Sequence, residues 1–215
     1  TTSLTVTKTA TKAGVVDTTK EFDFTLTLGS KSENVTWSKS SVTGVTTGGK
    51  VTSTPSYPFK LKGGESITFS GISVEDTNVK VTEDDYTAQH YTTTIDGRTG
   101  HDIAISADTL KQNQEAGTVT TVNFTNAYTT PKLPSMTIQK VVTGAFGERT
   151  KEFTFSVKLN NANPDLLNDV EFKGVTSTDS KESFKLKHGQ QVELKNIPIN
   201  TTITITETDA NEYET

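Results

Sequence analysis

The sequence predicts an all-β protein made of two antiparallel β-sandwich domains in tandem. Short runs of alternating apolar and polar residues occur throughout the chain, and Gly, Asn, Asp and Pro punctuate them, which is the pattern of sandwiches and barrels. Apolar residues at helical spacing are hard to find. Several short motifs also occur twice in the same order, which indicates two copies of one domain.

The first domain is predicted to span residues 1–129 and to consist of short strands in succession. Gly48-Gly49 and Gly63-Gly64 mark turns between strands, because glycine is a strong turn former. Residues 107–116 are expected to hold a helical turn. The expected strands are Leu4–Thr9, Glu21–Leu28, Asn34–Trp37, Tyr57–Lys62, Ser66–Ser70, Val79–Glu83, Tyr91–Ile95, Asp102–Ile105 and Thr118–Thr125.

The second domain is predicted to span residues 136–215, after a short proline-stiffened linker at 130–135. Compared with the first domain it is expected to lack its C-terminal strands, and the chain reads as part of something longer. The repeated motifs pair Leu4–Lys8 with Met136–Lys140, Lys20–Thr25 with Lys151–Ser156, Phe59–Gly64 with Phe184–Gly189, and Val81–Glu83 with Ile205–Glu207.

Composition narrows the classes of protein that fit. A net charge of −5 disfavours nucleic acid and anionic membranes as partners. The absence of cysteine fits a cytosolic protein or a bacterial surface protein stapled in another way. We see no membrane-spanning run, signal peptide or wall-sorting tail. No cofactor or metal is expected, because the acidic run 83–85 lacks calcium-loop spacing and the three histidines are scattered.

Three polar residues of the first domain fall on the apolar face of their strands. Lys8 follows Leu4 and Val6, and Glu83 and Asn126 likewise end apolar rows. A buried ammonium is rarely left unpaired, because removing it from water is costly. Lys8, Glu83 and Asn126 are therefore expected to meet in the core.

Intramolecular amide formation is the chemistry that needs these three residue types together. The Lys8 amine attacks the Asn126 side-chain carbonyl, and ammonia leaves. Burial favours the neutral amine and the protonated Glu83, which can then polarise the carbonyl and relay protons. The reaction is expected to occur once, so the protein is not a turnover enzyme.

The motifs resemble those of isopeptide-forming domains of Gram-positive pilins, in particular the streptococcal backbone-pilin (T-antigen, FctA-like) type, related to collagen-adhesin B-type domains. The resemblance covers the whole first domain and the second until its end. It implies immunoglobulin-like (Greek-key) sandwiches, with a Lys–Asn isopeptide bond and a catalytic Glu in each. Carried over by position, these are Lys8, Asn126 and Glu83, then Lys140 and Glu207, with no matching second asparagine in this chain.

The resemblance also implies a location and partners. We expect a shaft or stalk segment of a pilus or adhesin, outside the cell and wall-anchored in the full-length protein. Its partners would be neighbouring pilin subunits or adhesin domains, sortase and, for an adhesin, a host surface ligand. Two other interpretations remain open. A plain Lys8–Glu83 salt bridge would explain the core placement, and an adhesin domain would bind a host protein or glycan through loops at 38–56 or 96–117.

Overall fold

The structure is a computed structural model of the 215-residue chain, and it describes residues 1–174 and 183–208. The chain divides into two compact units, Thr1–Thr129 and Thr130–Thr215, and each is described by itself. The predicted all-β class is confirmed, since most elements are strands in antiparallel sheets. The end of the predicted second domain, residues 209–215, lies outside the described residues.

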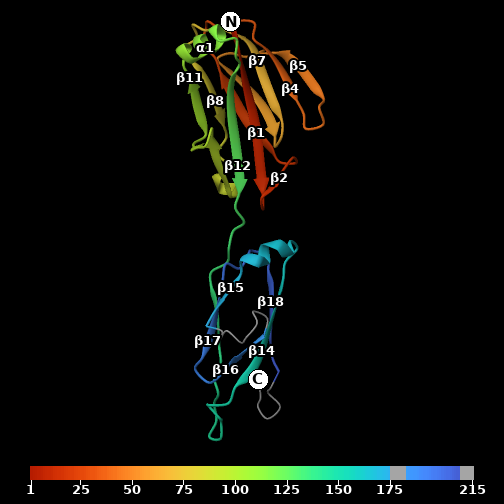
Figure 1. The fold of residues 1–215 in the computed structure, drawn as a ribbon, viewed down its shortest axis with the longest axis vertical. Coiled ribbons are helices and arrows are strands. Elements are labelled where there is room, and N and C mark those ends of the chain that lie inside the picture. The colour runs from red at the N-terminus through yellow and green to blue at the C-terminus, as the bar shows by residue number, and fades with distance from the viewer. Residues whose placement is uncertain (175–182, 209–215) are drawn as a thin grey trace. The chain divides into compact units, whose positions relative to one another are not determined.

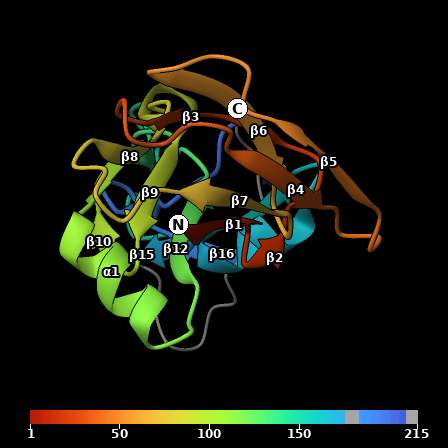
Figure 2. The same ribbon diagram turned by 90° about the horizontal axis from the view of Figure 1, so that it is seen from above.

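The first unit is a sandwich of two sheets (Figure 2). The larger sheet has the order β10-β9-β12-β1-β7-β4-β5, with β2 paired to β1, and the smaller has the order β11-β8-β3-β6. The strands are β1 (Thr2–Lys12), β2 (Val15–Val16), β3 (Glu21–Thr27), β4 (Thr36–Ser40), β5 (Thr46–Lys50), β6 (Ser56–Lys62), β7 (Ser66–Ile72), β8 (Val79–Glu83), β9 (Tyr91–Ile95), β10 (Arg98–Thr99), β11 (Asp102–Ile105) and β12 (Thr120–Tyr128).

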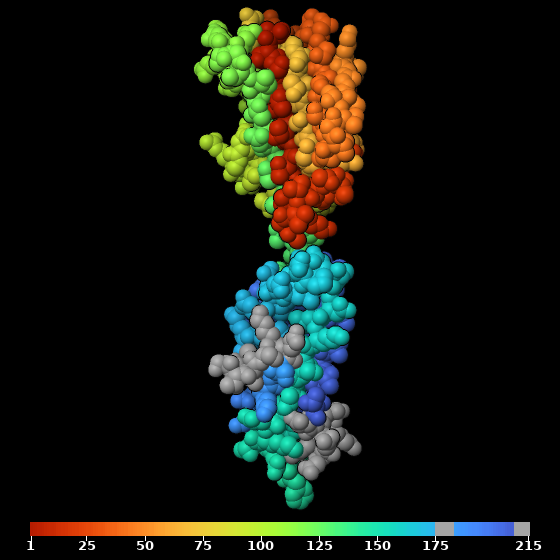
Figure 3. Space-filling view, turned by 45° about the vertical axis from the view of Figure 1, so that its right-hand side comes forward, coloured from red at the N-terminus to blue at the C-terminus, as the bar shows by residue number. Residues whose placement is uncertain are grey.

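Strand β1 lies at the centre of the larger sheet, between β12 and β7 (Figures 1 and 3). It pairs antiparallel with β7 but parallel with β12. Among the strands that the structure describes, this parallel pair is the one departure from the antiparallel pairing that the sequence predicts. Its alternate side chains point inward, so Leu4 and Val6 are fully buried. The first and last strands of the unit are therefore neighbours that run in the same direction.

The predicted strand Asn34–Trp37 overlaps β4 but its bounds were wrong, and so was the predicted turn at Gly48-Gly49. Asn34 has a left-handed backbone (φ 57°), so the strand begins at Thr36 rather than at Asn34. Gly48 and Gly49 lie within strand β5 and not at a turn. A Cβ on Gly49 would lie 3.0 Å from the Trp37 ring, so glycine lets this strand pass close to the indole.

The predicted helical segment is confirmed as α1 (Ala107–Glu115). Ser106 caps it by accepting a hydrogen bond from the Thr109 backbone N–H at 3.0 Å. Leu110 is the buried residue of this helix, and it joins the core of the first unit. A short 3-10 helix, η1 (Thr87–Gln89), precedes β9.

The described residues of the second unit form two three-stranded sheets, with orders β13-β17-β15 and β16-β14-β18. The pairing matches that of the repeated motifs in the first unit: β13 and β17 pair as β1 and β7 do, and β14 lies between β16 and β18 as β3 lies between β6 and β8. The elements are β13 (Met136–Gln139), β14 (Phe153–Asn160), the 3-10 helix η2 (Pro164–Asp169), β15 (Glu171–Lys173), β16 (Ser183–Leu186), β17 (Gln191–Lys195) and β18 (Thr202–Glu207).

The β18 side of the core is more exposed to solvent in the second unit than the corresponding β8 side is in the first unit. Ile205 on β18 is 43% exposed, whereas Val81, its counterpart on β8, is fully buried. Within the described ranges, β13 and β18 each pair with one strand, while β1 and β8 each have partners on both sides. The described part of the chain includes no helix that is long and apolar enough to cross a membrane.

Candidate functional site

Lys8, Glu83 and Asn126 meet in the core of the first unit. The Lys8 Nζ donates a hydrogen bond to Glu83 Oε1 at 2.6 Å and another to Asn126 Oδ1. The side chains of Lys8 and Glu83 are 0% exposed, and Asn126 is 0% exposed as well. The structure thus brings the three sequence-predicted residues into direct contact, away from solvent.

Strand register explains how the three residues come together. The parallel pairing of β1 with β12 places Asn126 opposite Ala10, two residues beyond Lys8 on the same inward face. Glu83 comes from the facing sheet, at the end of β8, where it lies opposite Phe24 of β3. The long lysine side chain therefore reaches both an amide in its own sheet and a carboxyl group in the other sheet.

Backbone hydrogen bonds fix the strands at this point. The Lys8 N–H donates to the Glu65 carbonyl at 2.9 Å, and the Lys8 carbonyl accepts from the Gly64 N–H at 2.8 Å. The Glu83 N–H donates to the His101 carbonyl at 2.8 Å. The predicted turn at Gly63-Gly64 is confirmed, with Gly64 in the left-handed region. These hydrogen bonds fix the backbone of Lys8 and that of Glu83, each within its own sheet.

Two aromatic rings surround the Lys8 amine. Its Nζ lies 4.0 Å from the centroid of the Phe22 ring and 5.6 Å from that of Phe24. The sequence prediction did not assign these rings to the site. The signal was present in the repeat, because Lys-Glu-Phe occurs at Lys20–Phe22 and again at Lys151–Phe153.

Burial shifts both ionisable groups toward their neutral forms. It lowers the pKa of Lys8 from 10.5 to about 8, although the nearby Glu83 carboxylate acts in the opposite direction. Burial also raises the pKa of Glu83, although Lys8 and His101 act to lower it. A neutral amine can act as a nucleophile, and a protonated carboxyl group can donate a hydrogen bond to an amide oxygen.

Lys140 and Glu207 form a corresponding pair in the second unit. The Lys140 Nζ lies 2.7 Å from Glu207 Oε1 and 4.0 Å from the Phe153 ring centroid. The backbone contacts also correspond, since the Lys140 N–H donates to the Gln190 carbonyl and its carbonyl accepts from the Gly189 N–H. The pair is slightly more exposed than that of the first unit, at 11% and 12%.

The second unit does not repeat the amide contact in the part that the structure describes. Within residues 130–174 and 183–208, the Lys140 amine donates its hydrogen bonds to the Glu207 carboxylate. In the first unit the amide comes from β12, the parallel neighbour of β1. Lys140 and Glu207 therefore form two thirds of the arrangement seen around Lys8.

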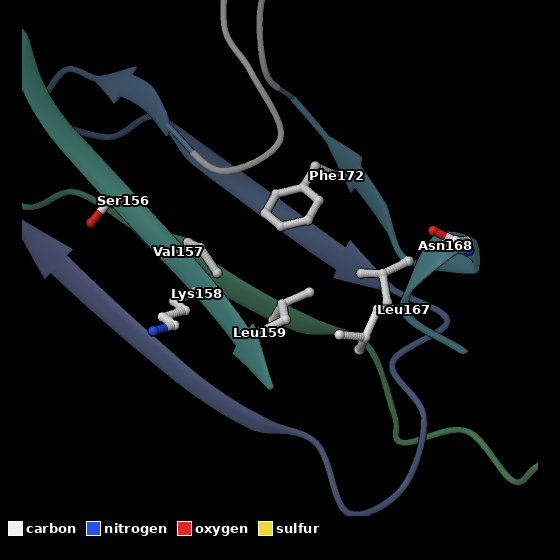
Figure 4. Close-up of a pocket in the computed structure, with 8 residues that line it drawn as sticks. Ser156, Val157, Lys158, Leu159, Leu167, Asn168 and Phe172 are labelled. Atoms are coloured by element: carbon white, nitrogen blue, oxygen red, sulfur yellow. The ribbon is translucent and has the colours of Figure 1, made fainter. Parts of the chain in front are cut away.

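An apolar hollow of about 630 Å³ lies elsewhere in the second unit, between β14 on one side and η2 with β15 on the other. Figure 4 shows Leu159, Leu167 and Phe172 directed into it, while the Lys158 amine points away. Neither Lys140 nor Glu207 lines it. Over the described ranges, no three His, Cys, Asp or Glu side chains are arranged to hold a metal ion.

Comparisons with known proteins find one family model and several pilus proteins to which the chain is similar. It matches the family described as a domain of unknown function, DUF7601, over residues 2–128 and 134–215. It is similar to the pilus tip adhesin Cpa of Streptococcus pyogenes, with 32% identity over 87 residues, which are 39% of this chain and 13% of the adhesin. The predicted resemblance to Gram-positive pilin-type domains is thereby confirmed.

Solved structures of S. pyogenes pilins are also similar. A major pilin is 32% identical, with 59% of this chain and 47% of the pilin covered and a TM-score of 0.45. The T-13 major pilin is 16% identical, with 99% and 83% covered and a TM-score of 0.38. The chain spans under half of the first pilin and a small part of the adhesin.

Proposed function

The chain belongs to the DUF7601 family, and we propose that it is a structural shaft or stalk segment of a Gram-positive surface pilus or adhesin, stapled by an isopeptide bond between Lys8 and Asn126. The observation that supports this most is the contact of a buried amine, a buried carboxyl group and a buried amide. Glu83 is the catalytic residue of the proposal, and the folded core supplies the proximity.

The proposed reaction is an amide exchange that needs no co-reactant. The lone pair of the neutral Lys8 Nζ attacks Asn126 Cγ, while the protonated Glu83 polarises Oδ1. Glu83 takes a proton from Nζ and gives one to Nδ2, the Cγ–Nδ2 bond breaks, and ammonia leaves. One amide nitrogen replaces another, so atoms and charge balance. The product replaces a buried amine by a neutral amide, which removes the cost of keeping an ionisable lysine in the core.

A bond at this position suits a protein that carries tension. Lys8 and Asn126 are 118 residues apart and lie on the first and last strands of the unit. Since β1 and β12 are parallel neighbours, the bond would carry force from one directly to the other. The segment between them could not be pulled out, even if its hydrogen bonds broke.

We propose that residues 1–129 and 136–215 are two domains of this type, joined by a linker at 130–135. Lys140 and Glu207 take the places of Lys8 and Glu83 in the second. Its asparagine would have to come from a strand beside β13. In the full-length protein we expect an extracellular, wall-anchored location, neighbouring pilin subunits or adhesin domains as partners, and attachment by sortase.

Extension under force tests the structural role. When the two ends of the chain are pulled apart in a single-molecule experiment, the measured extension should not increase by the length of the segment between Lys8 and Asn126. The Asn126→Ala variant should extend by the whole length of that unit, because only non-covalent contacts then hold it. A wild-type first unit that extends as far as the variant would contradict the proposal.

The pH dependence of stability tests the burial of Lys8. Glu83→Gln cannot relay protons, so we expect an unlinked chain whose Lys8 pKa is lowered by burial, as for the free amine in the structure. Between that lowered pKa, at or below about 8, and 10.5 the unfolded chain binds a proton that the folded chain does not. The free energy of unfolding should therefore rise with pH across this window.

Urea unfolding at intervals from pH 7 to about 10.5 measures this rise, and the double variant Lys8→Met, Glu83→Gln is the matched control. The control keeps every other titrating group, so subtracting its curve leaves the contribution of Lys8. A difference that is flat or falls with pH would show that the Lys8 amine stays charged in the folded core.

An adhesin domain is the second candidate, favoured by the sequence similarity to a pilus tip adhesin. It would bind a host protein or glycan through segments 38–56 and 96–117. The first contains the exposed strand β5 and the second contains α1. Binding of the purified chain to host cells, lost when these segments are replaced by short turns, would favour this candidate. No binding would leave the structural role.

A further inference from the structure

We propose that Thr93 is a positioning residue for Asn126, and that its hydroxyl group holds the amide in the orientation needed for attack by Lys8. This inference rests on the proposed function. It comes from a buried hydroxyl group beside the site that the reaction described above does not use. Thr93 Oγ1 has no hydrogen-bond partner among residues 1–174 and 183–208.

Strand register places Thr93 next to Asn126. Strand β9 is the antiparallel neighbour of β12, and Thr93 lies directly opposite Asn126 in that pairing. Both residues are buried, at 2% and 0% exposure, so both side chains point into the sandwich. Residues directly opposite one another in an antiparallel pair have Cβ atoms about 4.5–5.5 Å apart. The hydroxyl group is therefore within reach of the amide after small side-chain rotations.

The residue type at position 93 is itself informative. The inward-facing row of β9 is otherwise Tyr91 and Ile95, and valine would fill the same space as threonine without burying a polar group. A buried hydroxyl group without a partner destabilises the fold. Within the part of the chain that the structure describes, Asn126 Nδ2 and Glu83 Oε2 are likewise buried and without a partner at hydrogen-bonding geometry, although the Asn126 amide lies close enough to the Glu83 carboxyl group to act to lower its pKa. Thr93 Oγ1 and Asn126 Nδ2 belong to inward-facing residues directly opposite one another in a strand pair, so they can satisfy one another after small rotations.

The hydrogen bond from Nδ2 to Thr93 would distinguish the two ends of the amide. Attack requires Oδ1 to face Lys8 and Glu83, and the Lys8 amine already contacts it. A flipped amide would present Nδ2 to the amine instead and could not be polarised by Glu83. Thr93 Oγ1, as an acceptor, favours the productive orientation. When the Cγ–Nδ2 bond breaks, ammonia then leaves on the side of β9, away from the new amide nitrogen.

The test is the rate at which newly made full-length chains lose ammonia. Chains are synthesised in a short cell-free pulse, and their intact mass is followed over time. Thr93→Val keeps the shape but removes the hydroxyl group, so its mass loss should be about tenfold slower or more. Thr93→Ser restores the hydroxyl group and should react at close to the wild-type rate. Thr120→Val, which removes a buried hydroxyl group bonded to Asn113, should also react normally.

A second measurement separates positioning from folding. In a Lys8→Ala background, which cannot form the bond, Thr93→Val should unfold at the same urea concentration or a higher one. The proposal is overturned if Thr93→Val reacts as fast as the wild type, if Thr93→Ser is as slow as Thr93→Val, or if Thr93→Val lowers stability in the Lys8→Ala background. If no variant or wild-type chain loses ammonia, the proposed function itself fails, and this outcome is distinct from a slow Thr93 variant.

Discussion

Replacing Glu83 by alanine is expected to leave the chain at its full calculated mass and to destabilise the first unit more than the loss of the crosslink alone would. Two effects combine. The isopeptide bond is not formed, because no group remains to polarise the Asn126 amide and move protons. Lys8 also loses the partner that lies 2.6 Å from its amine, in a site with no access to solvent. Removing one member of a buried pair typically costs about 3–5 kcal/mol.

Glu65→Ala is the matched control for this variant. Glu65 is also buried and ion-paired, with Lys39 at 2.8 Å, but it does not contact the Lys8 amine. The control should lose stability yet still lose ammonia. Intact mass and urea unfolding, measured together, separate the two effects. A Glu83→Ala chain that still loses ammonia would remove Glu83 from the chemistry.

Replacing Asn126 by alanine is expected to give an unlinked chain with a smaller loss of stability. The Lys8–Glu83 pair remains, so the main change is the missing crosslink. For a disulfide that closes a loop of this length, the chain-entropy estimate is about 4–5 kcal/mol, and we expect a loss of that order here. The urea concentration at the unfolding midpoint should therefore be lower for Asn126→Ala than for the wild type, and lower still for Glu83→Ala.

Asn123→Ala is the control for this second variant. Asn123 lies three residues earlier on the same strand, but its side chain is exposed and bonds to Thr7 and Asp96. That variant should still form the isopeptide bond and keep most of its free energy of unfolding. If Asn126→Ala and Asn123→Ala unfold at the same midpoint as the wild type, Asn126 contributes no crosslink.

The sequence predicted the inward side chains well, because strand alternation is a local property. Lys8, Glu83 and Asn126 each continue an apolar row, and each is buried. The reach of Lys8 to both partners depends instead on which strands are neighbours. The parallel pairing of β1 with β12 brings Lys8 close to Asn126, 118 positions away in the sequence, and no local pattern specifies it.

The wrong prediction and the features that the sequence did not predict have physical causes. Gly48 and Gly49 have the composition of a turn, but they lie in strand β5, where a Cβ on Gly49 would crowd the Trp37 indole. The sequence does not distinguish Thr93, since one threonine in a strand carries no signal until its neighbour across the pair is known. The greater exposure of Ile205 than of Val81 likewise depends on which strands cover each residue, which their own motifs do not specify.

The most direct test of the central claim is the intact mass of the purified wild-type chain, followed by identification of the crosslinked peptide. We predict a mass below the calculated value by one ammonia, about 17 Da, and a proteolytic fragment that joins the peptides of Lys8 and Asn126. A second lost ammonia would place a further bond at Lys140. A wild-type chain at its full calculated mass would contradict the account, and Lys8 would then be a buried lysine held only by its ion pair with Glu83.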